Sequence, residues 1–167
     1  MARSTRTAQR VTAALVALAI FSAGCGRGLS NSYDSPEALA RAVLDALESK
    51  DRVALEALWV TRAEHRELLW DQLPESKSLP FEYARRINEI NSRKGIENAI
   101  HRYGGQRFEL ISIEFSRPAE KYDGFTVHFG TRLRVRRAKD GREGELPILD
   151  VVLEHHGRWK LMNFEDR

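Results

Sequence analysis

The stretch FTVHFGTRLRVR, residues 125–136, decides the fold class, because two kinds of side chain alternate along it. A β-strand places successive side chains on opposite faces of a sheet. One face is then formed by Phe125, Val127, Phe129, Thr131, Leu133 and Val135. The other face is formed by Thr126, His128, Gly130, Arg132, Arg134 and Arg136. The pattern predicts a strand with one face in the core.

Three further strands are predicted around this one, over residues 107–116, 145–156 and 158–164. Asp140-Gly141 and His156-Gly157 mark tight turns between neighbouring strands, because these residues tolerate positive φ. These strands and turns together predict a four-stranded antiparallel meander. In the register we expect, Arg132 faces Asp150 and His128 faces Glu154, two pairs of opposite charge.

The first half of the domain has helical periodicity instead. Ser35-Pro36-Glu37 has the form of a helix start, and Thr61 to Glu64 has the form of a capping box. The predicted helices cover 36–49, 52–59, a segment from Thr61 to Pro74, and a segment from Pro80 that Gly95 interrupts. Tyr83, Ile87 and Ile90 share one apolar face of the last helix.

Helices followed by an antiparallel meander predict an α+β domain, with the N-terminal helices packed on a curved C-terminal sheet. We expect Phe129, Leu133, Leu149 and Val151 to be buried against Leu39, Val43 and Leu58.

The element order and the terminal strand GRWKL, residues 157–161, resemble the nuclear-transport-factor-two-like (SnoaL-like, cystatin-like) α+β cone. The resemblance covers about residues 35–166. It implies either a cavity enzyme, such as an isomerase, cyclase or dehydratase, or a binding module. No catalytic motif of that family matches here residue by residue, so the resemblance assigns no catalytic residue.

The N-terminus has the composition of a secretory signal. Arg3, Arg6 and Arg10 precede an uncharged apolar run over residues 11–24, which ends in small residues. The run has about 14 residues, and a helix needs about 20 to span a bilayer. We therefore predict a signal peptide over residues 1–24 rather than a transmembrane helix.

Cys25, the only cysteine, directly follows Ser22-Ala23-Gly24. This arrangement resembles the lipobox of bacterial lipoproteins, with Ser22 where leucine is usual. The resemblance implies cleavage before Cys25, diacylglycerol on its sulfur and an acyl group such as palmitate on its amine. It also implies attachment to a bacterial membrane, the outer one in a diderm because Gly26 follows. The alternative is an ordinary secreted protein with an unpaired thiol.

The mature chain carries no net charge. Of 27 Lys and Arg residues, three lie in the predicted signal, which leaves 24 against 24 Asp and Glu. Nothing then favours nucleic acid as a partner. Residues 25–34 are predicted to be the lipidated cysteine and a small, polar tether, and residues 35–167 a single domain.

Asp150 and His128 are the candidate catalytic residues, because a carboxylate or imidazole in a cavity can act as a base. His128, Glu154 and His156 are the candidate metal ligands, since two histidines and a carboxylate form a known metal set. We favour ordinary cross-strand pairs as the interpretation of both groups, so we expect neither a catalytic nor a metal site. We expect no cofactor. His65 and His101 lie on predicted helices, where we expect solvent-exposed positions.

The second face of the predicted sheet mixes polar and large apolar residues. Its candidate binding residues are Arg132, Asp150, Trp159 and Asn163, beside Val152 and Leu161. An exposed apolar patch favours a partner, either a second copy or another envelope protein. The sequence thus favours a lipid-anchored, non-catalytic module that binds a ligand or a protein. The alternative is a cavity enzyme of lyase or isomerase type that uses Asp150 or His128.

Overall fold

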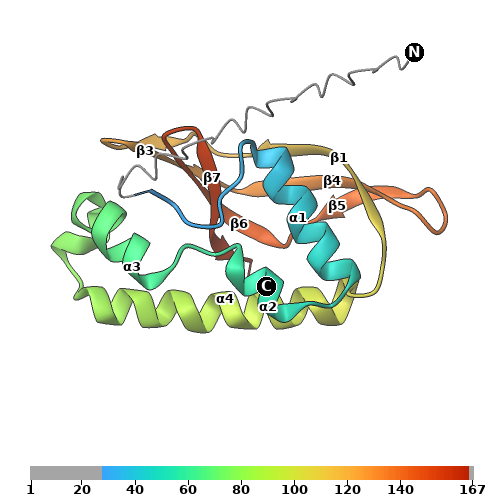
Figure 1. Cartoon of the computed structure of the whole chain (residues 1–167), viewed down its shortest axis with the longest axis horizontal. Helices are drawn as coiled ribbons and strands as arrows, with labels where there is room; N and C mark the ends of the chain where they lie inside the picture. The colour runs from blue at the N-terminus through green and yellow to red at the C-terminus, as the bar shows by residue number, and fades with distance from the viewer. Residues whose placement is uncertain (1–27, 166–167) are drawn as a thin grey trace, which may run out of the picture.

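The computed structural model describes residues 28–165 and shows an α+β fold (Figure 1), as predicted. The helices are α1 (Pro36–Glu48), α2 (Arg52–Ala57), α3 (Arg62–Glu64) and α4 (Phe81–Tyr103). The strands are β1 (Phe108–Phe115), β2 (Glu120–Lys121), β3 (Phe125–Phe129), β4 (Thr131–Arg137), β5 (Glu143–Leu146), β6 (Leu149–His155) and β7 (Arg158–Phe164). Within residues 28–165, no helix is both long and apolar enough to cross a bilayer.

The first three helices begin where their capping residues predict. The Ser35 hydroxyl accepts a hydrogen bond from the backbone N–H of Ala38, and the Asp51 carboxylate accepts one from Ala54. Thr61 and Glu64 form the predicted capping box, in which each side chain accepts from the other's backbone N–H. These bonds satisfy N–H groups that a helix start otherwise leaves without partners.

The predicted third helix is regular for one turn only. After α3 the chain forms a π-helix (His65–Leu69) and two 3₁₀ turns (Trp70–Gln72 and Pro74–Lys77). A π-helix widens the backbone, because its hydrogen bonds span five residues instead of four. Residues 65–77 therefore cover the sheet with a broad, irregular segment rather than a narrow helix.

Helix α4 is continuous through Gly95, which the sequence predicted to interrupt it. A Cβ atom at Gly95 would lie 2.5 Å from the backbone oxygen of Glu165, so glycine here permits close contact with the end of β7.

The apolar face of α4 that carries Tyr83, Ile87 and Ile90 lies outside the core, and Ile87 is 39% exposed. Tyr83 and Ile90 are each 56% exposed. The buried face includes Arg85, whose guanidinium donates to the backbone oxygen of Val60 and lies over the ring of Trp59. Because these contacts satisfy the charged group, Arg85 is buried on the same face as Phe81, Ile96 and Ala99.

The strands form two sheets, in the orders β1-β4-β5 and β2-β3-β6-β7. The single four-stranded meander that the sequence predicted is therefore divided. The predicted strand 125–136 bends at Gly130, which has φ +63° and separates β3 from β4. Its partner strand is interrupted at Pro147-Ile148, between β5 and β6. The bent hairpin thus passes from one sheet to the other.

The register differs from the prediction by two residues between β3 and β6, where His128 pairs with Val152 and Thr126 pairs with Glu154. It differs by three between β4 and β5, where Leu133 pairs with Leu146. An offset of two preserves the face of each side chain because side chains alternate with period two, whereas an offset of three reverses it, so Leu146 is buried and Glu145 is exposed. Between β6 and β7, His155 pairs with Arg158 as predicted, but the register shifts near Met162.

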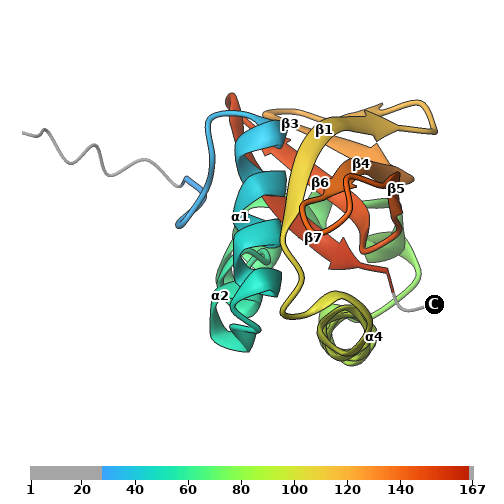
Figure 2. The same cartoon turned by 90° about the vertical axis from the view of Figure 1, so that its right-hand side faces the viewer.

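Both faces of β6 are covered, whereas the sequence analysis placed helices on one face only. Val152 and Leu153, neighbours in β6, are both fully buried but belong to different hydrophobic clusters. The first cluster lies among α1, α2, α4 and the strands, and contains Leu133 and Leu149 with Leu39, Val43 and Leu58, as predicted. Figure 2 shows α1 running crosswise to α4, which is seen end-on.

The second cluster lies between the segment 59–73 and the strands β3 and β6. It contains Val151, with Phe129 packed against it, so these two predicted core residues pack on the irregular segment instead of on α1. Both clusters are formed by residues within 28–165, so this part of the chain has its own core and we expect it to fold as one domain.

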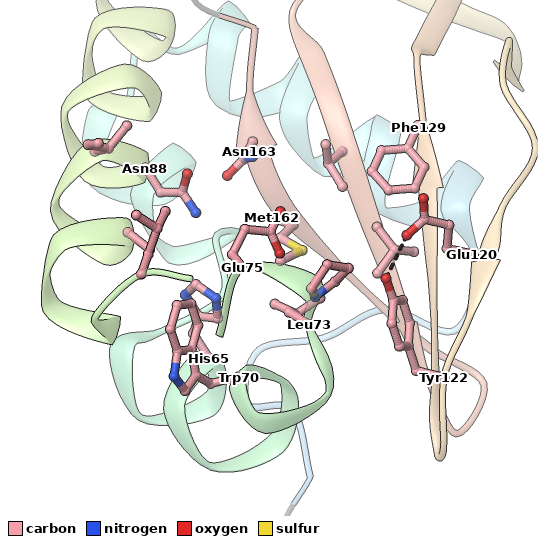
Figure 3. Close-up of a pocket in the computed structure, with 16 residues that line it drawn as sticks. His65, Trp70, Leu73, Glu75, Asn88, Glu120, Tyr122, Phe129, Met162 and Asn163 are labelled. Carbon is pink, nitrogen blue, oxygen red and sulfur yellow. Dashed lines mark hydrogen bonds between the residues drawn. The ribbon is translucent and has the colours of Figure 1, made fainter. Parts of the chain in front are cut away.

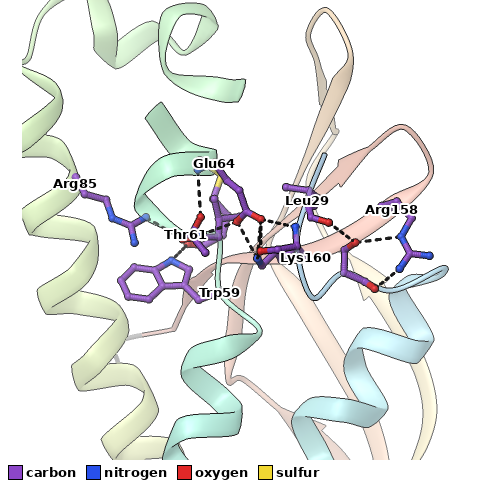
Figure 4. A network of polar contacts seen from close by, with 11 residues as sticks. Leu29, Trp59, Thr61, Glu64, Arg85, Arg158 and Lys160 are labelled. Atoms are coloured by element: carbon purple, nitrogen blue, oxygen red, sulfur yellow. Dashed lines mark hydrogen bonds and ion pairs between the residues drawn. The ribbon is translucent and has the colours of Figure 1, made fainter. Parts of the chain in front are cut away.

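The end of the predicted tether is bound to the domain (Figure 4). The backbone N–H and the hydroxyl of Ser30 both donate to the Glu64 carboxylate, at 2.6 and 2.8 Å. The fully buried Lys160 ammonium donates to the same carboxylate at 2.8 Å. The backbones of Tyr33 and Trp159 also pair. The domain therefore begins near residue 29, earlier than the predicted boundary at 35.

Candidate functional site

A cavity of about 340 Å³ lies between α4, the irregular segment after α3 and one face of the β2-β3-β6-β7 sheet (Figure 3). Strands β3 and β6 contribute Val127, Phe129 and Val151 to its wall, and α4 contributes Ala84, Ile87 and Asn88. The wall is mainly apolar, with a small number of polar groups. Small-molecule sites in proteins have this composition and a volume of about 300–1,000 Å³.

Three aromatic rings hold the irregular segment in place beside the cavity. The rings of His65, Trp70 and Phe81 contact one another edge to face, with centroid separations of 5.3–5.9 Å. All three side chains are buried. Such contacts stabilise beyond the burial of apolar area, so the imidazole of His65 has a fixed position in the cavity wall.

The irregular segment is also bound to the far end of the sheet. The Gln72 side-chain amide donates to the backbone oxygen of Asp123 at 3.0 Å and accepts from the Asp123 N–H at 2.8 Å. Asp123 follows β2, whose Glu120 lines the cavity together with Tyr122. The two hydrogen bonds therefore join both sides of the cavity at this end.

A β-bulge in β7 places two consecutive residues in the cavity wall. The pairing register shifts between Leu161 and Asn163, and both Met162 and Asn163 line the cavity. A regular strand would direct these neighbours to opposite faces. The Oδ1 atom of Asn163 is buried and accepts no hydrogen bond within residues 28–165. The Asn163 side chain thus lines the cavity with an acceptor whose hydrogen bond is not made in the described domain.

His65 is 3% exposed, and no hydrogen bond or ion pair joins its imidazole to a residue in the described range. Burial, together with the positive charge of Arg85, lowers the pKa of His65 from 6.5 to about 4. The ring is therefore neutral at pH 7, with one nitrogen that donates and one that accepts. Figure 3 shows it at the base of the cavity.

Acidic groups lie at the opposite side of the cavity. The Tyr122 hydroxyl donates to the Glu120 carboxylate at 2.6 Å, and Glu75 also lines the cavity. Burial raises the pKa of Tyr122 to about 12, and the hydrogen bond to Glu120 and the charges of Glu120 and Glu75 act in the same direction. Tyr122 therefore stays protonated, and Glu120 and Glu75 give this side of the cavity negative charge.

Asp150, a predicted catalytic residue, lies outside this cavity. Its side chain is 36% exposed and lies 3.8 Å from the guanidinium of Arg117. Arg132 lies beside it, in an open groove at the bend of the hairpin, and pairs with Glu145 at 3.7 Å. The groove is polar and open to water, so Asp150 lacks the closed cavity that the lyase or isomerase alternative requires.

His128, the other predicted catalytic residue, also lies outside the cavity, on the opposite face of β3. Its ring packs between Phe115 and Trp159, with centroid separations of 4.6 and 4.9 Å. The Nε2 atom is buried without a hydrogen bond in the described part of the chain and lies 3.7 Å from Glu154. We name Phe115, His128 and Trp159 the aromatic stack.

The predicted metal set does not form. His128 and Glu154 are neighbours, but His156 lies in the turn after β6 and its ring contacts His155 instead. Within residues 28–165, no three His, Cys, Asp or Glu side chains lie close enough together to hold a metal ion. The turn separates His156 from the face that carries His128.

The four predicted binding residues do not share one face. Arg132 and Asp150 line the open groove, Trp159 belongs to the aromatic stack, and Asn163 lines the cavity. Val152 and Leu161, the apolar members of the predicted face, are fully buried in the first cluster. The exposed apolar patch that favoured a partner there is absent from the described domain. The predicted lipid site, Cys25, lies outside the described residues.

Sequence reasoning found one of the cavity's polar residues, Asn163, and missed the others. His65 was expected to be solvent-exposed, yet it precedes Leu68 and Leu69 by three and four residues, which is the spacing of one helix face. That spacing is a signal of burial. No comparable signal identifies Glu75, Asn88 or Glu120, which come together only through the folded chain.

No protein-family model, no curated protein and no solved structure matches this chain.

Proposed function

We propose that the protein is a lipid-anchored envelope protein whose domain binds a small, largely apolar molecule in the cavity between α4 and the sheet. One observation carries the binding proposal: a cavity of about 340 Å³ with apolar walls is lined by His65 and Asn163, whose side chains each have a polar atom without a hydrogen bond in the described domain. Buried polar atoms without hydrogen bonds cost stability, so a site that retains them is suited to a ligand that supplies the bonds.

The same residues favour binding over catalysis. A general base works best when its pKa lies near the working pH, and the pKa of His65 lies well below neutrality. Asp150 and His128, on which the lyase or isomerase alternative depends, do not line the cavity. The neutral imidazole is suited to hydrogen bonding.

The anchoring part of the proposal rests on the sequence of residues 1–25. A positive segment, a short apolar run and a single cysteine after small residues support cleavage and lipidation at Cys25. Two or more acyl chains hold a protein stably at a membrane. Replacing Cys25 with serine should abolish labelling by a fatty-acid probe and release the protein from membranes. A wild-type chain without label would contradict this part.

We also propose that the domain is a nuclear-transport-factor-two-like cone. The α+β class, the order of helices before strands and the terminal strand Gly157 to Leu161 support this assignment. A crystal structure that superposes on no member of that group would contradict it, and the binding proposal would be unaffected.

Binding can be tested with the neutral dye N-phenyl-1-naphthylamine, which fluoresces in apolar surroundings, and with residues 28–167. Ala84 lines the cavity from α4, so Ala84→Phe fills space that the dye would occupy. The affinity of this variant for the dye should be at least about tenfold lower than that of the wild type. Asn91→Phe, on an exposed position of the same helix, is the control and should bind as the wild type does. Equal affinity of the two variants would contradict the proposed site.

A further inference from the structure

We propose that the ligand of this cavity is an organic cation: an apolar molecule with a protonated amine, bound with the amine at the acidic side formed by Glu75, Glu120 and Tyr122. This inference rests on the proposed function, because it names the chemical class of the molecule that the cavity binds. The cavity walls accept the apolar part of such a molecule, and its charged end requires compensation.

The two carboxylates at the cavity have no cationic partner in the described structure. Neither Glu75 nor Glu120 lies within 4 Å of a Lys, Arg or His nitrogen among residues 28–165. Two carboxylates of α4 do have such partners, since Glu82 pairs with Arg62 and Glu89 with Arg85. The nearest lysines in the sequence, Lys77 and Lys121, do not line the cavity. Negative charge at this place is therefore available to a ligand.

Aromatic rings border the same side of the cavity. Tyr122 and Phe129 line the wall near Glu120 (Figure 3), and the ring of Tyr122 stacks on Phe125 at 4.7 Å. An aromatic face attracts a cation, and a neutral or anionic ligand gains nothing comparable. Phe129 already has one cation near its ring, because the guanidinium of Arg117 lies 5.0 Å from the centroid.

The deeper polar groups define the other end of the ligand. The buried Asn163 Oδ1 requires an N–H or O–H donor, and His65, 97% buried and without a partner in the described domain, offers one donor and one acceptor. These two groups are independent of the carboxylates and also point to a ligand. A molecule with an amine at one end and a hydroxyl or amide at the other satisfies both sets.

The test is competition for bound N-phenyl-1-naphthylamine by three molecules of equal chain length: octylamine, octanol and octanoate. At pH 7 octylamine is a cation, octanol is neutral and octanoate is an anion. Octylamine should displace the dye at a concentration about fivefold lower than octanol, since a partly exposed ion pair contributes about that factor. Octanoate should be the weakest competitor.

Two variants test whether the advantage of octylamine over octanol comes from Glu120. Glu120→Gln retains an acceptor for the Tyr122 hydroxyl but removes the charge, so it should abolish most of the advantage of octylamine over octanol, with both competitors measured against the variant's own affinity for the dye. Glu114→Gln, an exposed position on β1 away from the cavity, should keep that advantage. Equal competition by octylamine and octanol on the wild type would overturn the inference and leave the binding proposal intact. Failure of the dye itself to bind would overturn both.

Discussion

Two histidines pack on opposite sides of the same sheet, and only His65 lines the cavity; His65 is 3% exposed and the side chain of His128 is 15% exposed. His65 contacts Trp70 and Phe81 on one side and the cavity on the other. The ring of His128 lies between Phe115 and Trp159 and lines no cavity found in the domain. Both lack hydrogen bonds to described residues. The difference teaches that burial alone does not identify a functional histidine; free volume beside its nitrogens does.

The aromatic stack and the cavity wall also differ in the interactions that hold their side chains in place. The aromatic stack is formed by side chains from three strands that pair with their neighbours in the sheets. The cavity wall depends on the irregular segment after α3, whose start is fixed by Glu64. Glu64 receives hydrogen bonds from Lys160, Thr61 and Ser30, so a single buried carboxylate joins three distant parts of the chain.

The largest effect is expected from Lys160→Ala, which leaves the Glu64 carboxylate buried without its cation. Breaking a buried ion pair from one side costs about 3–5 kcal/mol of unfolding free energy. Urea unfolding measures this loss, and Lys139→Ala, on an exposed turn, is the control. Dye binding at the cavity should weaken as well. A loss below about 1 kcal/mol would show that Glu64 does not hold the segment in place.

The second effect is a pH dependence of stability contributed by His65. Its folded pKa of about 4 lies below the unfolded value of 6.5, so the folded protein binds fewer protons between these values. The stability contributed by neutral His65 is therefore complete above pH 6.5 and is lost as the pH falls through 4. The shift corresponds to about 3 kcal/mol.

His65→Gln removes this titration. The difference in unfolding free energy between wild type and variant should change by about 3 kcal/mol between pH 7 and pH 4, measured by urea unfolding at each pH. Groups common to both proteins cancel in that difference, including Glu64, whose carboxylate loses its stabilising contribution only at lower pH. Burial alone would raise the pKa of Glu64, but the hydrogen bonds from Lys160, Thr61 and Ser30 outweigh it and lower it to about 2. If the difference in unfolding free energy between wild type and variant were the same at pH 7 and pH 4, the lowered pKa of His65 would be contradicted.

The smallest effect is expected from His128→Leu. Leucine loses the contacts of the imidazole with two rings but also removes a buried nitrogen without a hydrogen bond, and these contributions are similar in size. Stability should therefore change by less than about 1 kcal/mol, and dye affinity should stay at the wild-type value. A large loss of dye binding in His128→Leu, with the fold intact by circular dichroism, would place function on the aromatic stack instead.

The sequence predicted those features that short-range chemistry decides. The α+β class follows from the change of hydrophobic period, and the starts of α1, α2 and α3 follow from Ser35, Asp51 and Thr61. The hairpin at His156-Gly157 also has the predicted register. In each case residues close in the chain form the stabilising hydrogen bonds.

Features that depend on distant residues could not be predicted in this way. Gly95 looks like a helix breaker until the backbone of Glu165 is seen against it, and the outward face of α4 follows from the contacts of Arg85 with Val60 and Trp59. The candidate site depends on the bulge at Met162 and on the irregular segment that contains His65. Periodicity predicts only regular elements, so the candidate residues Asp150 and His128 came from two strands that were predicted to be regular.

The measurement that tests the central claim most directly is nuclear magnetic resonance of the side-chain amides during titration of residues 28–167 with N-phenyl-1-naphthylamine. Asn88 and Asn163 line the cavity from α4 and β7, whereas the Trp159 indole belongs to the aromatic stack. If the cavity is the binding site, the amide signals of Asn88 and Asn163 shift with the dye and the indole signal of Trp159 does not. Unchanged amide signals together with a shifting Trp159 indole would contradict the account.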